Sequence, residues 1–478
     1  ESLGEALARW LPAHQAENGF EPIPEQDARR AHDYAMRTAW SDTNDATYQA
    51  MEALIHNLNT MNSRAGAQVP FSSINYGTDT SPEARMAIRN LLLATDAGLG
   101  DGETPIFPVQ IFKVKEGVNF NPGDPNYDLF RLAIKTSAKR LFPNFSFLDA
   151  PFNLQYYKPG DYNTEVAYMG CRTRVMGNVY DPDREVTCGR GNLSFTSINL
   201  PRIAIEAKGD LNAFFRMLDD RMDLVVRQLL HRFQIQCGKK VYNYPFLMGQ
   251  GVWIDSDKLG PDESVEEVLR HGTLSVGFIG LAETLKALTG KHHGESGESQ
   301  KLGLKIIGHM RDRMDEESRK RRLNFTLLAT PAEGLSGRFL RMDQKKYGKL
   351  PGITDRDYYT NSFHVPVYYP ISAFKKIELE APYHALTNAG HISYVELDGD
   401  VCRNLDAFES VVRWMKQCGV GYGSVNHPVD RDPVCGYTGV IGDVCPRCGR
   451  REGEGVSVEK LRELRKKFPS MPQFVGLE

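Results

Sequence analysis

The stretch Leu193-Ser-Phe-Thr-Ser-Ile198, with the long amphipathic segment that follows it, decides the fold class. Its short run of apolar and hydroxyl side chains predicts a β-strand. From Leu211 to Phe233, apolar side chains recur on one helical face, and that pattern stops at Cys237-Gly238. Thr273 to Ile279 then predicts another strand. Strands joined by crossover helices favour a parallel sheet or barrel with reactive residues on the loops at strand ends, so we predict an α/β fold.

The same alternation of helix and strand patterns continues toward the N-terminus. The predicted elements are a helix over 48–61, a strand over 69–76, a helix capped by Ser81-Pro82-Glu83, and a strand over 107–114. Residues 1–11 resemble the interior of a helix and carry neither an initiator Met nor a signal-peptide pattern. We therefore expect the chain to be a fragment of a longer protein.

Composition excludes several classes of protein. Of the 478 residues, 41% are apolar and 25% are charged, which excludes disorder as the main state. The formal net charge of −3 provides no cationic field, so we expect neither a nucleic acid nor a membrane as a partner. No apolar run approaches the roughly 20 residues of a membrane-spanning helix. Eight cysteines in so long a chain are too few for a disulfide scaffold, and they favour a reducing, cytoplasmic location.

Two short cysteine knuckles near the C-terminus predict a metal site. Asp432-Pro-Val-Cys435 is followed by Cys445-Pro-Arg-Cys448-Gly449. Donor atoms three residues apart around a glycine turn suit the tetrahedral coordination of Zn²⁺, so Cys435, Cys445 and Cys448 are predicted ligands of a structural zinc ion. Asp432 stands where a fourth cysteine is usual, which leaves Asp432, His427 or water as the fourth ligand.

Other polar motifs have simpler interpretations. His292 and His293 fall in the polar loop 290–299 and are expected to be solvated. The basic run 319–322 complements a helix dipole. Thr330-Pro-Ala-Glu333 has the pattern of a capping box, although such a helix N-terminus also suits a phosphate, with Glu333 near the sugar. By spacing alone, Cys171 is a buried structural thiol, because no histidine lies close in sequence to activate it.

A set of motifs in one order nevertheless identifies a family. They are Gly123-Asp-Pro-Asn-Tyr-Asp128, Met169-Gly-Cys-Arg172, Gly191-Asn-Leu-Ser194, Ser197-Ile-Asn-Leu-Pro-Arg-Ile-Ala204, Thr330-Pro-Ala-Glu333, Tyr358-Tyr-Thr-Asn-Ser-Phe-His364 and the two knuckles. From about residue 45 to about residue 455, the chain resembles the oxygen-sensitive class III anaerobic ribonucleoside-triphosphate reductases.

The resemblance implies a ten-stranded α/β barrel of the glycyl radical enzyme and ribonucleotide reductase type, incomplete at its N-terminus. A finger loop in that barrel would carry Cys171 at its tip, and this interpretation replaces the structural one. Its thiyl radical would abstract the 3′ hydrogen of a ribonucleotide, with Asn192 bonded to the sugar hydroxyls, Glu333 as a base toward the 3′ hydroxyl, and Met169 lining the pocket. Thr330, Ala332 and Gly334 would bind substrate at the helix start.

The sequence departs from the family in three ways. No cysteine precedes Cys171, the N-terminal barrel segment and any ATP-binding cone are absent, and no radical-glycine loop follows the zinc knuckles. Gly436 lies within the first knuckle and is rejected as the radical glycine. We therefore expect the glycyl radical on a residue absent from this chain, and we expect the chain alone to be inactive.

The resemblance also implies a domain plan and partners. We expect a partial catalytic barrel over 1–424, a zinc-knuckle domain over 425–455, and a C-terminal helix and tail over 456–478. Expected partners are a ribonucleoside triphosphate, formate or a thioredoxin-like reductant, a radical-SAM activating enzyme, dNTP or ATP effectors, and a second copy of the chain. Cys188, Cys237, Cys402 and Cys418 have no predicted role. Alternatives are another glycyl radical enzyme, the cobalamin-dependent reductase, or a catalytically silent nucleotide-binding or zinc-ribbon module.

Overall fold

The computed structural model describes residues 17, 25–62, 68–100, 102–427, 430–432, 434–439, 441–451 and 454–467. Its α-helices are α2 (Glu25–Thr60), α3 (Pro82–Ala97), α4 (Tyr127–Arg140), α5 (Pro151–Leu154), α6 (Leu200–Ala207), α7 (Leu211–Cys237), α8 (Glu266–Leu269), α9 (Leu281–Thr289), α10 (Gly297–Arg321), α11 (Glu333–Tyr347), α12 (Ala373–Leu386), α13 (Leu405–Cys418) and α14 (Val458–Lys467). The predicted helix over residues 1–11 lies outside the described residues.

Most strands belong to two sheets. A five-stranded sheet has the order β1-β2-β3-β10-β9, and a parallel three-stranded sheet has the order β6-β7-β8. Their bounds are β1 (Ser73–Tyr76), β2 (Val109–Val114), β3 (Asn144–Phe147), β6 (Asn192–Asn199), β7 (Thr273–Ile279), β8 (Asn324–Ala329), β9 (Ser393–Glu396) and β10 (Tyr422–Asn426). Two short ribbons complete the set, β4 (Tyr168–Met169) with β5 (Thr173–Arg174) and β11 (Asp430–Arg431) with β12 (Thr438–Gly439).

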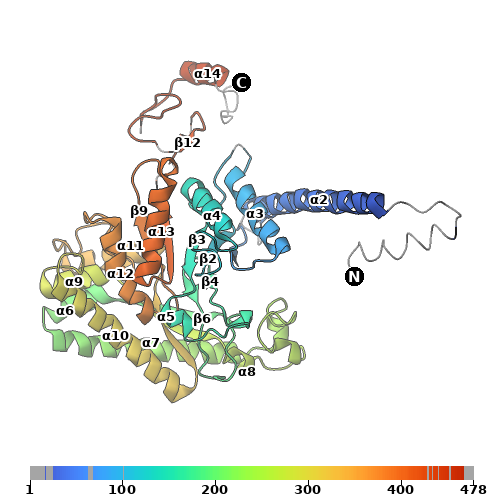
Figure 1. Cartoon of the computed structure of the whole chain (residues 1–478). Helices are drawn as coiled ribbons and strands as arrows, with labels where there is room; N and C mark the ends of the chain where they lie inside the picture. Colours follow the sequence, from blue (N-terminus) through green and yellow to red (C-terminus); the bar gives the residue numbers. More distant parts are fainter. Residues whose placement is uncertain are drawn as a thin grey trace.

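Helices cover the outer face of each sheet (Figure 1). On the three-stranded sheet, the apolar core joins α6, α7, α9 and α10 to alternate residues of the strands. On the five-stranded sheet, a second core joins α3, α4, α12 and α13 to residues such as Phe112 and Val114. The inner face instead carries Val109, Ile111 and Tyr422, which pack against Tyr168 of the β4–β5 ribbon. The ribbon therefore lies against the side of the sheet that the helices leave uncovered.

The two sheets are joined where Ala389 and Gly390 lie beside the end of β8. Gly390 makes an isolated parallel bridge with Leu328 at the end of β8, shortly before β9 begins. Across this bridge the strands of the two sheets form one spatial series, β1-β2-β3-β10-β9-β8-β7-β6, which is consistent with the α/β class. Closure into ten strands stays a prediction, because the two sheets contain five and three strands in the residues that the structure describes.

The local predictions agree with the structure at the strongest patterns. The strand predicted over 273–279 is β7 with the same bounds, and the long amphipathic helix is α7, which ends at Cys237. The Ser81 side chain caps α3 by accepting a hydrogen bond from the Ala84 N–H at 3.3 Å. The basic run 319–322 ends α10 as expected. Among the described residues, no helix is both long and apolar enough to cross a bilayer.

Candidate active site on the finger loop

The β4–β5 ribbon is a tight hairpin whose tip holds Gly170, Cys171 and Arg172. Gly170 adopts a positive φ of 56°, which suits glycine and permits the reversal. On one side, the Tyr168 backbone exchanges two hydrogen bonds with the Asn75 side chain of β1, at 2.8 and 3.1 Å. On the other side, Thr173 bridges to Gly390. We call residues 168–174 the finger, because they stand on the inner face between the two sheets.

Gly390 allows the finger to approach the sheets this closely. A β-carbon at Gly390 would lie 2.1 Å from the Arg172 carbonyl oxygen, and the residue has a φ of +137°, which favours glycine. The buried Arg172 guanidinium donates from Nη1 to the carbonyl oxygens of Ala329 and Thr330, each at 3.3 Å. The finger tip is therefore held to the end of β8.

Cys171 itself is half-buried, whereas its spacing alone predicts a buried thiol. Burial raises the pKa of the Cys171 thiol, Arg172 opposes that shift, and the carboxylate of Glu333 raises the pKa further. The same two charges act on the phenol of Tyr394, and the Arg172 guanidinium lies 5.9 Å from the centre of its ring. Cys171, Arg172, Glu333 and Tyr394 thus form one cluster, with Cys171 in its protonated form at neutral pH.

Glu333 is the first residue of α11, but the predicted capping box is wrong. Ala332 occupies the N-cap position, and no side chain there accepts a hydrogen bond from the helix. The Thr330 hydroxyl is instead 2.8 Å from the Ser197 hydroxyl of β6. Because the N–H groups of the first turn are not capped by Thr330, they remain available, and Glu333 and Gly334 are exposed there.

The inner face of the three-stranded sheet is polar. Asn192 begins β6 and donates to the Thr273 hydroxyl at 3.0 Å and to the Ser275 hydroxyl, which is itself 2.9 Å from the Thr326 hydroxyl. No hydrogen bond within the described residues joins Asn192 to Cys171. Met169, half-buried, pairs with Thr173 at the base of the hairpin. A buried parallel sheet usually carries apolar side chains on both faces, so hydroxyls here indicate a face prepared for a polar ligand.

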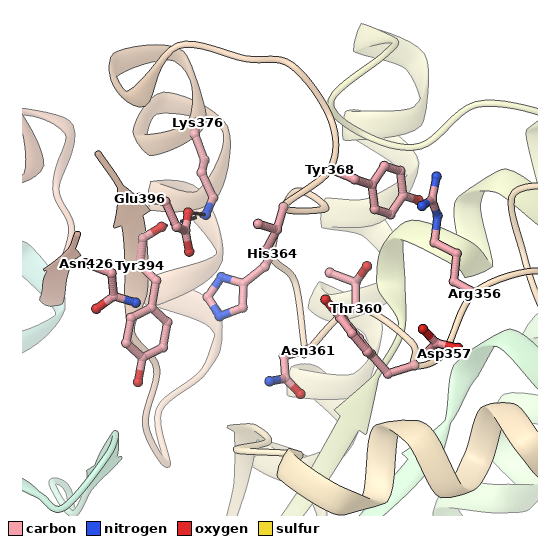
Figure 2. Close-up of a pocket in the computed structure, with 12 residues that line it drawn as sticks. Arg356, Asp357, Thr360, Asn361, His364, Tyr368, Lys376, Tyr394, Glu396 and Asn426 are labelled. Carbon is pink, nitrogen blue, oxygen red and sulfur yellow. Dashed lines mark hydrogen bonds and ion pairs between the residues drawn. The ribbon is translucent and has the colours of Figure 1, made fainter. Parts of the chain in front are cut away.

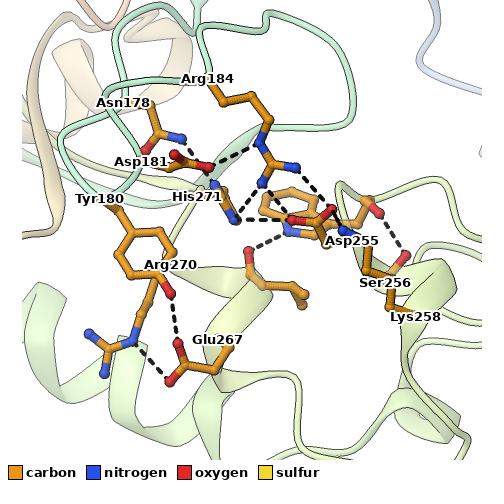
Figure 3. A network of polar contacts seen from close by, with 12 residues as sticks. Asn178, Tyr180, Asp181, Arg184, Asp255, Ser256, Lys258, Glu267, Arg270 and His271 are labelled. Atoms are coloured by element: carbon orange, nitrogen blue, oxygen red, sulfur yellow. Dashed lines mark hydrogen bonds and ion pairs between the residues drawn. The ribbon is translucent and has the colours of Figure 1, made fainter.

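A polar network fixes the chain that returns from the finger (Figure 3). Arg184 pairs with Asp255 at 3.0 Å, and this partner holds the pKa of the Asp255 carboxyl well below its ordinary value. Asn178 lies 3.0 Å from the His271 ring and accepts from Asn324, the first residue of β8, at 3.1 Å. The network ties the return segment to the start of the three-stranded sheet.

Histidines around the finger are buried rather than solvated. His391 lies 2.8 Å from the Tyr168 hydroxyl, and His384 lies 2.9 Å from the Ser393 hydroxyl. The prediction of solvated His292 and His293 is wrong, because both are buried, and the His293 ring bonds to the Phe363 carbonyl at 2.8 Å. Rings from distant segments pack against them, Tyr369 against His292 and Tyr383 against His293, and the polar composition of loop 290–299 does not indicate these contacts.

We expect these histidines to make the protein sensitive to acid. Burial lowers the pKa of His293 to about 4 and that of His384 to about 3, whereas both would titrate near their ordinary value when unfolded. The unfolded chain therefore binds more protons between about pH 6.5 and pH 4, and the stability present above that range is lost as pH falls, by roughly 3 kcal/mol for His293 alone. Melting temperature measured from pH 7.5 to pH 4.5 should fall steeply below pH 6.5; a flat profile would contradict this prediction.

The C-terminal cysteine cluster is a candidate metal centre. One donor atom each from Asp432, Cys435, Cys445 and Cys448 lies within 4.8 Å of the others, and the Sγ atoms of Cys435 and Cys445 are 3.6 Å apart. Both knuckles close with a backbone bond to a glycine of positive φ, Gly436 N–H to the Asp432 carbonyl and Gly449 N–H to the Cys445 carbonyl. This cluster could bind a metal ion.

The structure distinguishes between the protein candidates for the fourth ligand, which the sequence leaves open. Asp432 Oδ1 accepts from the N–H groups of Val434 and Cys435, whereas Oδ2 is shared between Arg450 at 3.0 Å and Cys448. His427 instead lies 3.3 Å from the Ser137 carbonyl and is not in the cluster. Of the protein candidates, the geometry favours Asp432.

Comparison with known proteins decides the family. A family model described as anaerobic ribonucleoside-triphosphate reductase matches residues 15–461. The chain belongs to this family. The anaerobic ribonucleoside-triphosphate reductase of Salmonella typhimurium is 36% identical over 431 residues, covering 88% of this chain and 59% of that protein. The protein of the same name from Enterobacteria phage T4 is 35% identical over 430 residues, covering 87% of this chain and 68% of that one.

Solved structures agree on the fold. The anaerobic ribonucleotide reductase from Thermotoga maritima in complex with dATP and CTP matches with a TM-score of 0.58 at 16% identity, covering 95% of this chain and 71% of that one. Glycerol dehydratase from Clostridium butyricum, described as B12-independent, matches with a TM-score of 0.55 at 11% identity, covering 86% of this chain and 56% of that one. The α/β fold is thus that of the anaerobic reductases, and it extends to a dehydratase.

Proposed function

We propose that this chain is the finger-bearing and metal-binding part of an enzyme that reduces ribonucleoside triphosphates to deoxyribonucleoside triphosphates without oxygen. Family membership supports the activity, although the chain spans 59% of the Salmonella relative. The observation that carries the proposal is the cluster at the finger tip, where the Glu333 carboxylate contributes to the raised pKa of the Cys171 thiol.

The geometry suits hydrogen-atom chemistry better than a thiolate nucleophile. Burial and Glu333 keep the Cys171 thiol protonated, and no histidine is hydrogen-bonded to it in the described residues. As a thiyl radical, Cys171 would take the 3′ hydrogen of the ribose and become S–H again. Glu333 would accept the 3′ hydroxyl proton and return a proton to the 2′ hydroxyl, which leaves as water, so that C3′ becomes a carbonyl and the unpaired electron moves to C2′. Formate or a thioredoxin-like protein would supply the electrons that reduce the ring.

The remaining proposed roles follow from position. Asn192 would hydrogen-bond the sugar hydroxyls from the polar sheet face, and Met169 would line the same space. The start of α11 would take substrate phosphate on its N–H groups, with buried Thr330 and Ala332 just before the helix and exposed Gly334 in its first turn as the substrate-binding residues. The family's glycyl radical would supply the unpaired electron that Cys171 requires.

Partners and metal are part of the proposal. Zn²⁺ fits the cluster of three thiolates and one carboxylate, with Asp432, Cys435, Cys445 and Cys448 as ligands in a structural role.

A radical-SAM activating enzyme and nucleotide effectors would be partners, in a reducing cytoplasm. A second copy would pair along α2, which leaves the body as a single helix with Tyr34, Met36 and Trp40 exposed (Figure 1); the oligomeric state in solution tests this pairing.

Glu333→Gln should lower turnover without unfolding the helix. The amide cannot accept the 3′ hydroxyl proton, so kcat should fall by about 10² to 10⁴, whereas α11 should be unaffected because no capping bond involves this side chain. The measurement is anaerobic conversion of CTP to dCTP by the full-length protein, with the melting temperature of each variant alongside. Glu298→Gln, at a similarly early position of α10, is the matched control. Unchanged turnover in Glu333→Gln would remove the base from the proposal.

A further inference from the structure

A cavity lies beside the finger, and Cys171, Asn192 and Glu333 are not among the residues that line it. Its volume is about 520 Å³ (Figure 2). Tyr394, one of its walls, also belongs to the cluster around Cys171. Tyr359, between the lining residues Tyr358 and Thr360, donates its N–H to the Ser336 carbonyl of α11 at 3.5 Å. The cavity therefore adjoins the cluster in which the finger tip meets Glu333, the first residue of α11.

His364 is a buried side chain of this cavity with one unpaired hydrogen-bonding atom. Only 7% of it is exposed, and its Nδ1 lies 3.2 Å from the Glu380 carboxylate, which also accepts the Val365 N–H at 3.0 Å. Burial opposes ionisation of Glu380, but neighbouring Lys376 and the contact with His364 outweigh it and lower the pKa of this carboxyl, so the carboxylate is the acceptor and Nδ1 carries the hydrogen. Burial lowers the pKa of His364, which leaves the imidazole neutral. Nε2 is then a lone-pair acceptor, and it has no hydrogen-bond partner in the described structure.

A buried acceptor that is left unpaired is destabilising. In Figure 2 the His364 ring projects into the cavity between Tyr394 and Asn361. Lys376 does not bond to Nε2; its ammonium donates to the Tyr394 carbonyl at 2.6 Å and pairs with Glu396 at 3.1 Å. A ligand that brings an N–H or O–H donor into the cavity would satisfy Nε2.

The other walls indicate a planar ligand. Three tyrosines, Tyr358, Tyr368 and Tyr394, line the cavity together with the amides of Asn361 and Asn426. Aromatic faces stack with heterocycles, and amides pair with their edges, which is how proteins bind unstacked nucleobases. Each of the four bases offers an amine or ring N–H to an acceptor.

We propose that this cavity binds the base of the ribonucleotide whose ribose meets Cys171, and that His364 Nε2 accepts a hydrogen bond from that base. The inference rests on the proposed function and adds a base-recognising residue to it. The base would lie among the tyrosines, and its sugar would extend past Tyr394 toward the finger tip, with the phosphates toward α11.

Binding of CTP and of ribose 5-triphosphate to the full chain, measured by calorimetry, tests the proposal. His364→Phe keeps a ring of similar size but removes the acceptor, so CTP should bind about 10-fold more weakly, while ribose 5-triphosphate, which lacks a base, should bind unchanged. His364→Gln keeps an acceptor oxygen and should restore CTP binding to within about 3-fold. His231→Phe makes the same change on an exposed face of α7 and is the control.

Each outcome decides. CTP binding that is equal in the wild type, His364→Phe and His364→Gln overturns the proposal, as does failure of wild-type chain to bind CTP. If His364→Phe weakens dATP instead of CTP, the cavity is an effector site, and the assignment to substrate is wrong. If His364→Phe does not fold, His364→Gln is the test. A loss of CTP affinity in folded His364→Gln, without a matching loss of affinity for ribose 5-triphosphate, would contradict the proposal that an acceptor at this position is sufficient. CTP binding that depends on His364, without reduction in the complete enzyme, would retain the cavity and reject the proposed activity.

Discussion

Replacement of Cys171 by serine should abolish ribonucleotide reduction in the complete, activated enzyme. Loss of a reacting group that works in concert with others typically costs 10⁴-fold or more in kcat. Serine preserves the size and the hydrogen-bonding capacity of the side chain, but its O–H bond is too strong to form the radical that a thiol forms. The expected result is dCTP formation at the background rate.

The same variant should be folded and should bind nucleotide. The finger is held by the Tyr168 backbone, Gly390 and Arg172, none of which depends on the sulfur atom. Melting temperature and CTP affinity should therefore match those of the wild type. Cys188→Ser is the matched control, since Cys188 is exposed and its thiol contacts only Asn163 at 3.5 Å. Turnover by Cys171→Ser above about a hundredth of the wild-type rate would exclude a thiyl radical at this position.

The strongest sequence patterns predicted individual helices and strands, whereas contacts between distant segments could not be predicted from them. Strand 273–279 and helix 211–237 were predictable because their periodicity reflects a buried face within one element. The capping box at Thr330 failed because the Thr330 hydroxyl pairs with Ser197, more than a hundred residues away. Local propensity contains no information about such a partner.

The candidate site was likewise only partly predictable from the sequence. Cys171 was assigned through a family motif, not through its spacing, which suggested an inert thiol. Arg172 and Tyr394 were not predicted, because only the fold brings them to the finger. One signal in the sequence was available: Thr273, Ser275 and Gly277 alternate with Leu274, Val276 and Phe278, and this period of two predicts a polar face on a strand that parallel sheets usually bury on both sides.

Cys445→Ser should release the metal and unfold the C-terminal module. The described part of residues 430–451 contains one two-stranded ribbon and two glycine turns, and the side chains buried in that part, Asp432, Cys435 and Cys445, are themselves proposed ligands. A module with so little apolar core owes its folding to metal binding, which contributes about 10–16 kcal/mol for structural zinc.

Serine is a poor zinc ligand at neutral pH, so metal analysis should find less than a tenth of an equivalent of zinc in the variant, against one in the wild type. Limited proteolysis should then cleave within residues 430–451 while the two sheets, whose cores lie elsewhere, stay intact. Cys402→Ser, at a thiol outside the cluster that donates to the Ala138 carbonyl at 3.2 Å, should retain both zinc and protease resistance. Asp432→Asn separates the two roles of that carboxylate: its side-chain oxygen can still accept the Val434 and Cys435 N–H groups, so a large loss of zinc affinity would identify Asp432 as a ligand. Full zinc occupancy in Cys445→Ser would instead show that the knuckles fold without the metal.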